Sequence, residues 1–219
     1  MIKVYIQAVE NRLPYVNQSI IPSLNKHGFT DIEIFCDYER ISPLWNAKRI
    51  WDAISKQDSP CLIFQDDVVF HKSFGDAVGE ILAHFKNGTM QAASLFVPPR
   101  KIYATYFSRG FNFIENYDFL WMPAMILTPS FCRGLLAHAQ TSTHNKHDDC
   151  VVGDYSKESS TPVFNCLPSI VQHNLNLKST LGTSKTIGRV ERRSYVWEQT
   201  IRPEHFKKIH SITHGKPKE

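Results

Sequence analysis

The hydrophobic positions in the first third of the chain follow two alternating spacings. Residues 3–9, 31–37 and 61–64 form short alternating or continuously apolar runs, which predict strands. Other apolar residues recur at helical spacing, namely Leu13, Val16, Ile20 and Leu24; Leu44, Ala47, Trp51 and Ile54; and Phe74, Val78, Ile81, Leu82 and Phe85. This order of strands and helices predicts an α/β fold, with a mainly parallel central sheet flanked by helices.

Glycine, serine and proline mark where the expected helices begin and end. Gly28 and Gly88 follow two of the helical patterns, as is typical of helix stops. Ser42 followed by Pro43 is typical of an N-cap with proline at the first helical position. Pro22 falls inside the first helix, and we expect it to bend or shorten that helix.

The second half of the chain has a less regular pattern. Further strands are expected over 92–97, 120–127 and 163–167. A helix is expected from Thr128-Pro129 to about residue 138. Segment 98–118 is rich in aromatic and basic residues but has no clear periodicity, so we expect a loop. Its aromatic side chains could stack on an acceptor or fold onto the core.

The end of the chain differs from the rest in charge. Residues 185–219 carry nine Lys or Arg and four Glu, which gives +5, whereas the whole chain has +4. We therefore expect one catalytic domain over 1–184 and a basic, irregular C-terminal extension over 185–219, packed on or near that domain. Such a tail favours an anionic partner, either nucleic acid, a membrane surface or the phosphates of a nucleotide; a solvated tail is the alternative.

Composition excludes several classes of protein. No stretch is long and apolar enough to span a membrane, and the first residues lack the pattern of a signal peptide. The five cysteines are scattered, without a Cys-x-x-Cys pair, and mostly lie in apolar runs. This favours reduced thiols over a disulfide scaffold, and we expect a cytoplasmic protein.

Two adjacent carboxylates, Asp66 and Asp67, follow the apolar run 61–64 almost directly. In open α/β sheets, ligands bind beyond the carboxyl ends of the strands. Carboxylates at such a place can hold a hard divalent cation, Mn²⁺ or Mg²⁺, which would bridge and neutralise a diphosphate. The alternative is that both residues only end the strand and begin a turn.

Two segments resemble a known family. The stretch Leu-Ile-Phe-Gln-Asp-Asp-Val at 62–68 resembles the Asp-x-Asp-type motif of GT-A glycosyltransferases, particularly the Glu-Asp-Asp-Val form of the procollagen galactosyltransferase and lipooligosaccharide transferase group. Pro-Ser-Ile-Val-Gln-His at 168–173 is similar to the Pro-Ser-Leu-Val-Gln-His segment late in this fold, and Ser-Thr-Leu-Gly at 179–182 continues the likeness. Gln65 departs from the pattern, since the family often has an acid there.

The resemblance implies a GT-A, Rossmann-like domain that binds a nucleotide sugar, in the first place a UDP-sugar. It implies Asp67 and His173 as ligands of one metal ion, with Asp66 near the ribose or the diphosphate. A nitrogen ligand beside carboxylates would favour Mn²⁺ over Mg²⁺. A structural histidine is the alternative interpretation of His173.

The nucleotide is expected on the first two strands. Four candidates follow the first strand and lead into a helix N-terminus, which favours anions: Ala8, Val9, Glu10 and Arg12. Asp37 ends the second strand, where GT-A enzymes commonly hold the base or ribose. Asn46 and Arg49 on the next helix can share a face and resemble polar residues used near the nucleotide. An ordinary solvated helix face is the alternative.

A second acidic cluster has the pattern His144-x-x-His147-Asp148-Asp149. Asp148 or Asp149 could deprotonate the acceptor hydroxyl in an inverting enzyme. One Asp with His144 and His147 could instead bind zinc, although no further His or Cys partner is evident nearby. The simplest alternative is an acidic helix N-terminus.

The sequence therefore predicts a metal-dependent glycosyltransferase that acts on an acceptor hydroxyl. The acceptor is expected to be a hydroxymethylated base in DNA, as in compact phage enzymes of related fold, or a glycan. Two other classes stay open. One is a nucleic-acid-binding module without catalysis, and the other is a metal-dependent nucleotidyltransferase or phosphohydrolase, which also places paired carboxylates at strand ends.

Overall fold

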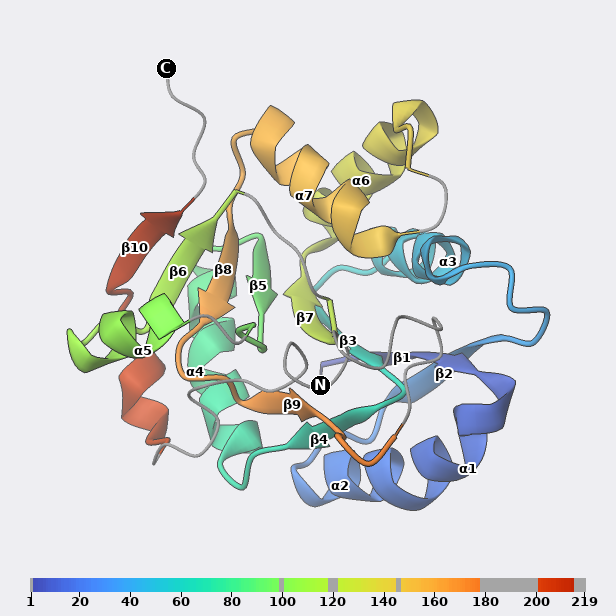
Figure 1. Cartoon of the computed structure of the whole chain (residues 1–219), viewed down its shortest axis with the longest axis horizontal. Coiled ribbons are helices and arrows are strands. Elements are labelled where there is room, and N and C mark those ends of the chain that lie inside the picture. Colours follow the sequence, from blue (N-terminus) through green and yellow to red (C-terminus); the bar gives the residue numbers. More distant parts are fainter. Residues whose placement is uncertain (1, 99–100, 118–121, 145–146, 178–200, 215–219) are drawn as a thin grey trace.

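The computed structural model describes residues 2–98, 101–117, 122–144, 147–177 and 201–214. Its main sheet has eight strands (Figure 1). From one edge to the other they are β10 (Ser211–His214), β6 (Phe113–Asn116), β8 (Val163–Cys166), β5 (Ala92–Ser94), β7 (Ala124–Leu127), β3 (Cys61–Gln65), β1 (Val4–Val9) and β2 (Ile32–Asp37). Four neighbouring pairs are parallel and three are antiparallel. The fold class expected from the sequence, a mainly parallel sheet flanked by helices, is confirmed.

Helices cover both faces of this sheet (Figure 1). Because side chains alternate along a strand, Val4, Ile6 and Ala8 of β1 face one core and Tyr5 faces the other. The first core is completed by α4 (Phe74–Lys86) and by the helical segment after β1. The second core is completed by α3 (Pro43–Ser55), α6 (Pro129–Thr141) and α7 (Asp148–Glu158).

The helical segment after β1 contains a wider turn. It comprises η1 (Glu10–Arg12), α1 (Leu13–Tyr15), the π-helical η2 (Val16–Ile20) and α2 (Ile21–Lys26). Pro22 has no N–H to donate, and its ring crowds the carbonyl group of the preceding turn. A π-type turn relieves this conflict without ending the helix. The expected distortion is therefore a local widening rather than a break.

Most expected helix ends are present. The Ser42 hydroxyl accepts a hydrogen bond from the Trp45 N–H at 3.0 Å, with Pro43 at the first helical position. Gly28 follows α2 with φ +86°, and Gly88 follows α4 with φ +72°. This left-handed conformation has no steric cost for glycine, which is why the pattern predicted these positions correctly.

Segment 98–118 differs from the expected loop. It contains α5 (Lys101–Ser108) and strand β6. Tyr103 and Phe113 are fully buried, and Tyr106 and Phe107 pack on a small core cluster. For these aromatic residues, folding onto the core is therefore the correct alternative.

A second sheet, separate from the main one, consists of two short antiparallel strands. They are β4 (Val68–Phe70) and β9 (Val171–His173), and Val68 lies opposite His173. β4 begins two residues after Asp66, so this small sheet lies just beyond the carboxyl end of β3 (Figure 1). Strands of three residues are too short to produce a recognisable pattern, and neither was predicted.

Part of the basic tail belongs to the fold. Within 201–214, η3 (Pro203–Phe206) packs on α4 and β10 adds the edge strand beside β6. Phe206 is fully buried, and its carbonyl oxygen lies 2.6 Å from Nε2 of His84. The rest of the segment 185–219 lies outside the described residues. None of the helices in the described ranges is long and apolar enough to cross a membrane.

Candidate active site

Asp66 lies just beyond the carboxyl end of β3, beside the end of β1. These strands are parallel neighbours, with Gln7 opposite Gln65. The Oδ2 atom of Asp66 accepts a hydrogen bond from the backbone N–H of Val9 at 2.8 Å. The end of β1 therefore fixes the orientation of this carboxyl group, at the sheet edge where ligands of open α/β sheets bind.

The surroundings of Asp66 disfavour its charge. The side chain is only 8 % exposed, and burial raises its pKa to about 7. The neighbouring Asp67 carboxylate raises the pKa further, whereas the Val9 N–H and the Arg12 guanidinium lower it. A cation bound beside this carboxyl group would favour its ionised form.

Asp67 and His173 meet across the small sheet. The Oδ1 atom of Asp67 lies 3.1 Å from Nδ1 of His173, although 106 positions separate them in the sequence. The β4–β9 register brings them together, and the Asn174 N–H donates to the Asp67 carbonyl oxygen at 2.6 Å. The ring of Phe96 packs edge-on against the imidazole, with centroids 5.3 Å apart. The structure thus brings the two residues of the predicted pair into contact.

This donor pair fits a divalent cation. With metal–ligand bonds of about 2.1 Å, two donors at right angles around one ion lie about 3.0 Å apart. In this structure the two side chains are hydrogen-bonded at 3.1 Å, and the same separation is compatible with two ligands of one ion. Within the residues that the structure describes, no group of three or more His, Cys, Asp or Glu is arranged to hold a metal. A cation here would need further ligands from a substrate or water, as Mg²⁺ commonly has.

Two residues near this pair were not predicted. The Tyr15 hydroxyl donates to the Val68 carbonyl oxygen at 3.0 Å, and the nearby Asn174 side chain lowers the pKa of Tyr15. Burial raises the pKa of Tyr15, the Asp67 charge raises it further, and the Arg12 charge lowers it. No local pattern in the sequence indicated Tyr15, because its partner, the Val68 carbonyl oxygen, lies on a strand whose position only the fold determines.

The predicted residues after β1 have different surroundings. Val9 contributes its N–H to Asp66, as described above. Arg12 is buried in the turn of η1, within electrostatic reach of Asp66 and Tyr15. Ala8 is buried in the core, whereas Glu10 is exposed. Binding of a nucleotide by these residues stays a prediction.

The predicted residues at the end of β2 and on α3 make internal contacts. Both carboxylate oxygens of Asp37 accept backbone hydrogen bonds, from Ile41 at 3.0 Å and Ser42 at 3.1 Å. The buried amide of Asn46 donates to the carbonyl oxygens of Phe35 at 2.7 Å and Ala8 at 3.3 Å.

Arg49 contacts Asn46 and the Cys36 carbonyl oxygen, and its guanidinium lies 4.6 Å from the centre of the Trp45 ring. These contacts hold α3 to the two strands. A role of Asp37, Asn46 and Arg49 at the nucleotide is untested and stays a prediction.

The structure separates the two candidate bases. Asp148 is buried at the first turn of α7, where Nε2 of Gln7 donates to its Oδ2 atom at 3.3 Å. Burial raises the pKa of Asp148 to about 6, and the Asp149 charge contributes, whereas the Gln7 hydrogen bond lowers it. Asp149 is half-buried and accepts from the Cys150 N–H at 2.9 Å. Gln7 thus ties Asp148 to β1, and this role of Gln7 was not predicted.

The histidines of the acidic cluster point to different partners. Nε2 of His144 lies 3.0 Å from Oδ2 of Asp154 on α7, and both side chains are at least one-third exposed. His147 is the residue before α7 and is exposed. A zinc site built from this cluster gains no support from these contacts.

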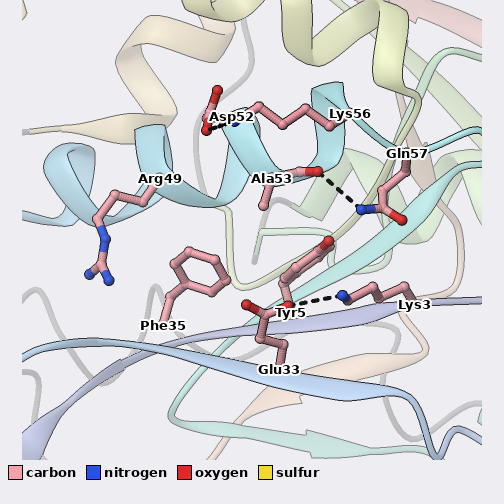
Figure 2. Close-up of a pocket in the computed structure, with 9 residues that line it drawn as sticks. All are labelled: Lys3, Tyr5, Glu33, Phe35, Arg49, Asp52, Ala53, Lys56 and Gln57. Atoms are coloured by element: carbon pink, nitrogen blue, oxygen red, sulfur yellow. Dashed lines mark hydrogen bonds and ion pairs between the residues drawn. The ribbon is translucent and has the colours of Figure 1, made fainter.

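A surface hollow of about 420 Å³ lies away from these residues (Figure 2). It is bounded by α3 and by β1 and β2, and it contains the ion pair Lys3–Glu33 at 3.0 Å and the pair Asp52–Lys56 at 2.6 Å. Lys3 precedes β1 and Glu33 is near the start of β2, so the hollow opens toward the amino ends of these strands. Asp66 and Asp67 instead follow the carboxyl end of β3.

Comparison with known proteins adds two distant structures. No protein-family model and no curated protein sequence matches this chain. One similar solved structure is described as a glucose-1-phosphate thymidylyltransferase from Bacillus anthracis in complex with a sucrose; it has 8% sequence identity and a TM-score of 0.44, and the match covers 79% of this chain and 89% of that one. Another, an apo UDP-glucose pyrophosphorylase, has 9% identity and a TM-score of 0.40, over 75% and 72% of the two chains.

Proposed function

We propose that this chain is a metal-dependent glycosyltransferase, which moves a sugar from a UDP-sugar to an acceptor hydroxyl group. The observation that carries the proposal is the 3.1 Å separation of Asp67 Oδ1 and His173 Nδ1, directly beside Asp66. One imidazole and one carboxylate, with a second carboxylate next in the chain, suit a divalent cation that also contacts a diphosphate.

Each residue of the site has a separate task in this proposal. Asp67 and His173 hold Mn²⁺ or Mg²⁺, which when bound would neutralise the charge that develops on the leaving nucleotide diphosphate. Asp66, fixed by the Val9 N–H, orients the ribose or the diphosphate. Arg12 adds a positive charge on the same side, since it acts on the pKa of Asp66.

Asp148 is the proposed base if the reaction inverts configuration. It takes the proton of the acceptor hydroxyl while that oxygen bonds to the anomeric carbon and the bond from this carbon to the diphosphate breaks. The raised pKa of about 6 leaves the carboxyl group ionised at neutral pH yet basic enough to accept a proton. In a retaining reaction this role does not apply.

The proposed acceptor is a hydroxymethylated base in DNA or a glycan. The basic composition of 185–219 supports an anionic acceptor. Deleting the whole tail would be a poor test, because Ile201 and Phe206 belong to the main core. Changing Arg189, Arg192 and Arg193 to Gln removes three positive charges and leaves Ile201 and Phe206 unchanged. Salt-sensitive retention of the wild-type chain on duplex DNA, weakened in this variant, would favour DNA over a neutral glycan.

Product analysis tests the transferase proposal directly. Wild-type protein, Asp67→Asn and the exposed-carboxylate control Asp52→Asn are incubated with a panel of UDP-sugars, Mn²⁺ and each acceptor class. We expect sugar transfer and UDP release by the wild type and the control, and loss of both in Asp67→Asn and in EDTA. Transfer by Asp67→Asn at the wild-type rate, with EDTA harmless, would overturn the proposal.

The same assay separates the other classes. A nucleotidyltransferase would release pyrophosphate from a nucleoside triphosphate and a sugar phosphate, and would leave a UDP-sugar and acceptor unchanged. A phosphohydrolase would release phosphate without an acceptor. A non-catalytic nucleic-acid-binding module would show no metal-dependent stabilisation by UDP in a thermal unfolding scan.

A further inference from the structure

The hydroxyl group of Tyr15 lies where two segments of the candidate site meet. It donates a hydrogen bond to the Val68 carbonyl oxygen at 3.0 Å, and the nearby Asn174 side chain lowers its pKa. Val68 directly follows Asp67, and Asn174 directly follows His173. One phenol therefore contacts the residue after each member of the Asp67–His173 pair.

The small sheet that carries this pair needs support from elsewhere. β4 and β9 have only three residues each, and a two-stranded ribbon of this size is at best marginally stable alone. The Asn174 N–H closes the end of the ribbon by donating to the Asp67 carbonyl oxygen at 2.6 Å. Tyr15 comes from α1, which belongs to the helical segment after β1. It therefore anchors the ligand end of the ribbon to the main body of the fold.

We propose that Tyr15 is a positioning residue, which holds the Asp67 and His173 donor atoms at the separation that one divalent cation requires. This inference rests on the proposed function, since it concerns the same site. A displacement of either strand by about one ångström would take the two donors out of the right-angled arrangement about a single ion that their 3.1 Å separation allows. The hydroxyl group of Tyr15 opposes such a displacement in both strands at once.

Mn²⁺ binding in the absence of substrate tests this role. Free Mn²⁺ is followed by electron paramagnetic resonance during titration of the wild type, Tyr15→Phe and Asn174→Ala. Tyr15→Phe keeps the ring and removes only the hydroxyl group. We expect about tenfold weaker Mn²⁺ binding in Tyr15→Phe, as is usual when a group that orients a metal ligand is lost. Asn174→Ala, which removes the other side-chain contact, should also weaken binding.

A matched control and a double mutant exclude a general effect on stability. Tyr106→Phe removes a hydroxyl group from another half-buried tyrosine, on α5, and should bind Mn²⁺ like the wild type. If Tyr15 acts through the pair, Tyr15→Phe should cost little further affinity once His173 has been changed to Ala. A nonspecific loss of stability would instead lower affinity equally in both backgrounds.

The outcomes distinguish the two proposals. Saturable Mn²⁺ binding by the wild type with equal affinity in Tyr15→Phe and Asn174→Ala would overturn the positioning role and leave the proposed function standing. Equal loss from Tyr15→Phe in the wild-type and His173→Ala backgrounds would also overturn it. No saturable Mn²⁺ binding by the wild type would overturn both.

Discussion

The side-chain amide of Gln7 donates one hydrogen bond to the Pro43 carbonyl oxygen at 2.9 Å and another to Asp148 at 3.3 Å. A residue of strand β1 thus links the start of α3 to the start of α7. Because Asp148 is buried, its charge is disfavoured, and Gln7 offsets only part of that cost. This arrangement has consequences for stability and for activity.

Stability should fall as pH rises through the titration of Asp148. The folded pKa of about 6 exceeds the ordinary value of 3.8, so the folded protein binds the proton more tightly than the unfolded chain. Ionisation of the buried Asp148 therefore lowers the free energy of unfolding by about 3 kcal/mol. This loss is absent below pH 4 and complete above pH 6. Asp148→Asn should therefore show a smaller decrease in unfolding free energy between pH 4 and 7, measured by urea denaturation.

Asp149→Asn is the control for that measurement. Asp149 is half-buried, and its charge raises the pKa of Asp148 less than burial does. Its loss should leave most of the pH dependence in place. Identical curves for Asp148→Asn and the wild type would contradict the assignment of this dependence to Asp148.

The two aspartates should also differ in catalysis if the reaction inverts configuration. Asp148→Asn should lower kcat at least 100-fold and remove the acidic limb of the rate profile near pH 6. Asp149→Asn should lower kcat by less than about tenfold, because the remaining carboxylate still accepts the proton. Initial rates from pH 5 to 8 measure both effects. If kcat fell further in Asp149→Asn than in Asp148→Asn, Asp149 rather than Asp148 would be the base.

Removing the imidazole of the Asp67–His173 pair should weaken metal binding and slow sugar transfer together. His173→Ala should weaken Mn²⁺ binding and slow transfer by about 100-fold or more, since one of two protein ligands is lost. Isothermal titration calorimetry and product assays measure the two losses. His84→Ala is a suitable comparison, because His84 is buried beside η3 and contacts the Phe206 carbonyl oxygen instead. Mn²⁺ affinity unchanged in His173→Ala would remove this residue from the site.

Asn46 is expected to matter for folding. Its amide satisfies the carbonyl oxygens of Phe35 and Ala8, at the ends of two strands. Asn46→Ala leaves buried carbonyl groups without these donors and should lower the unfolding free energy by about 1–3 kcal/mol. Denaturation experiments at pH 7 measure the change, with the exposed Asn87 changed to Ala as the control. An unchanged unfolding free energy in Asn46→Ala would contradict this structural role and would favour the predicted role of Asn46 at the nucleotide.

The described part of the tail should be needed for stability. Phe206 is fully buried against Phe113 and α4, with the two rings 5.7 Å apart. Phe206→Ala should cost about 3–5 kcal/mol. The neighbouring Lys207→Ala should cost less than about 0.5 kcal/mol, because that side chain is exposed. Similar unfolding midpoints in urea for the two variants would show that the tail is not part of the core.

Long periodic segments account for what the sequence predicted well. β1, β2, β3, α3 and α4 each have enough apolar positions for the spacing to be unambiguous. Ser42 marks the start of α3, and Gly88 marks the end of α4. The Asp67–His173 contact was predicted from two motifs rather than from spacing. It depends on a strand pairing between distant segments, and local patterns contain no information about such pairings.

The missed features are short or depend on partners far away in the sequence. β4 and β9 have three residues each, below the length at which alternation is visible. Asn46 was predicted near the nucleotide, with a solvated helix face as the alternative, and its internal contacts were missed. Its partners, Phe35 and Ala8, lie on strands whose positions relative to α3 only the fold determines. Tyr15 and Gln7 were missed for the same reason.

The pairing of Val68 with His173 has a mechanical consequence. The intervening chain, including α4, α5, α6 and α7, forms one large loop whose two ends meet beside Asp67. An ion bound by side chains from both ends would act as a reversible cross-link that opposes any opening which parts them. Amide hydrogens of β4 and β9 should then exchange with solvent more slowly when Mn²⁺ is present.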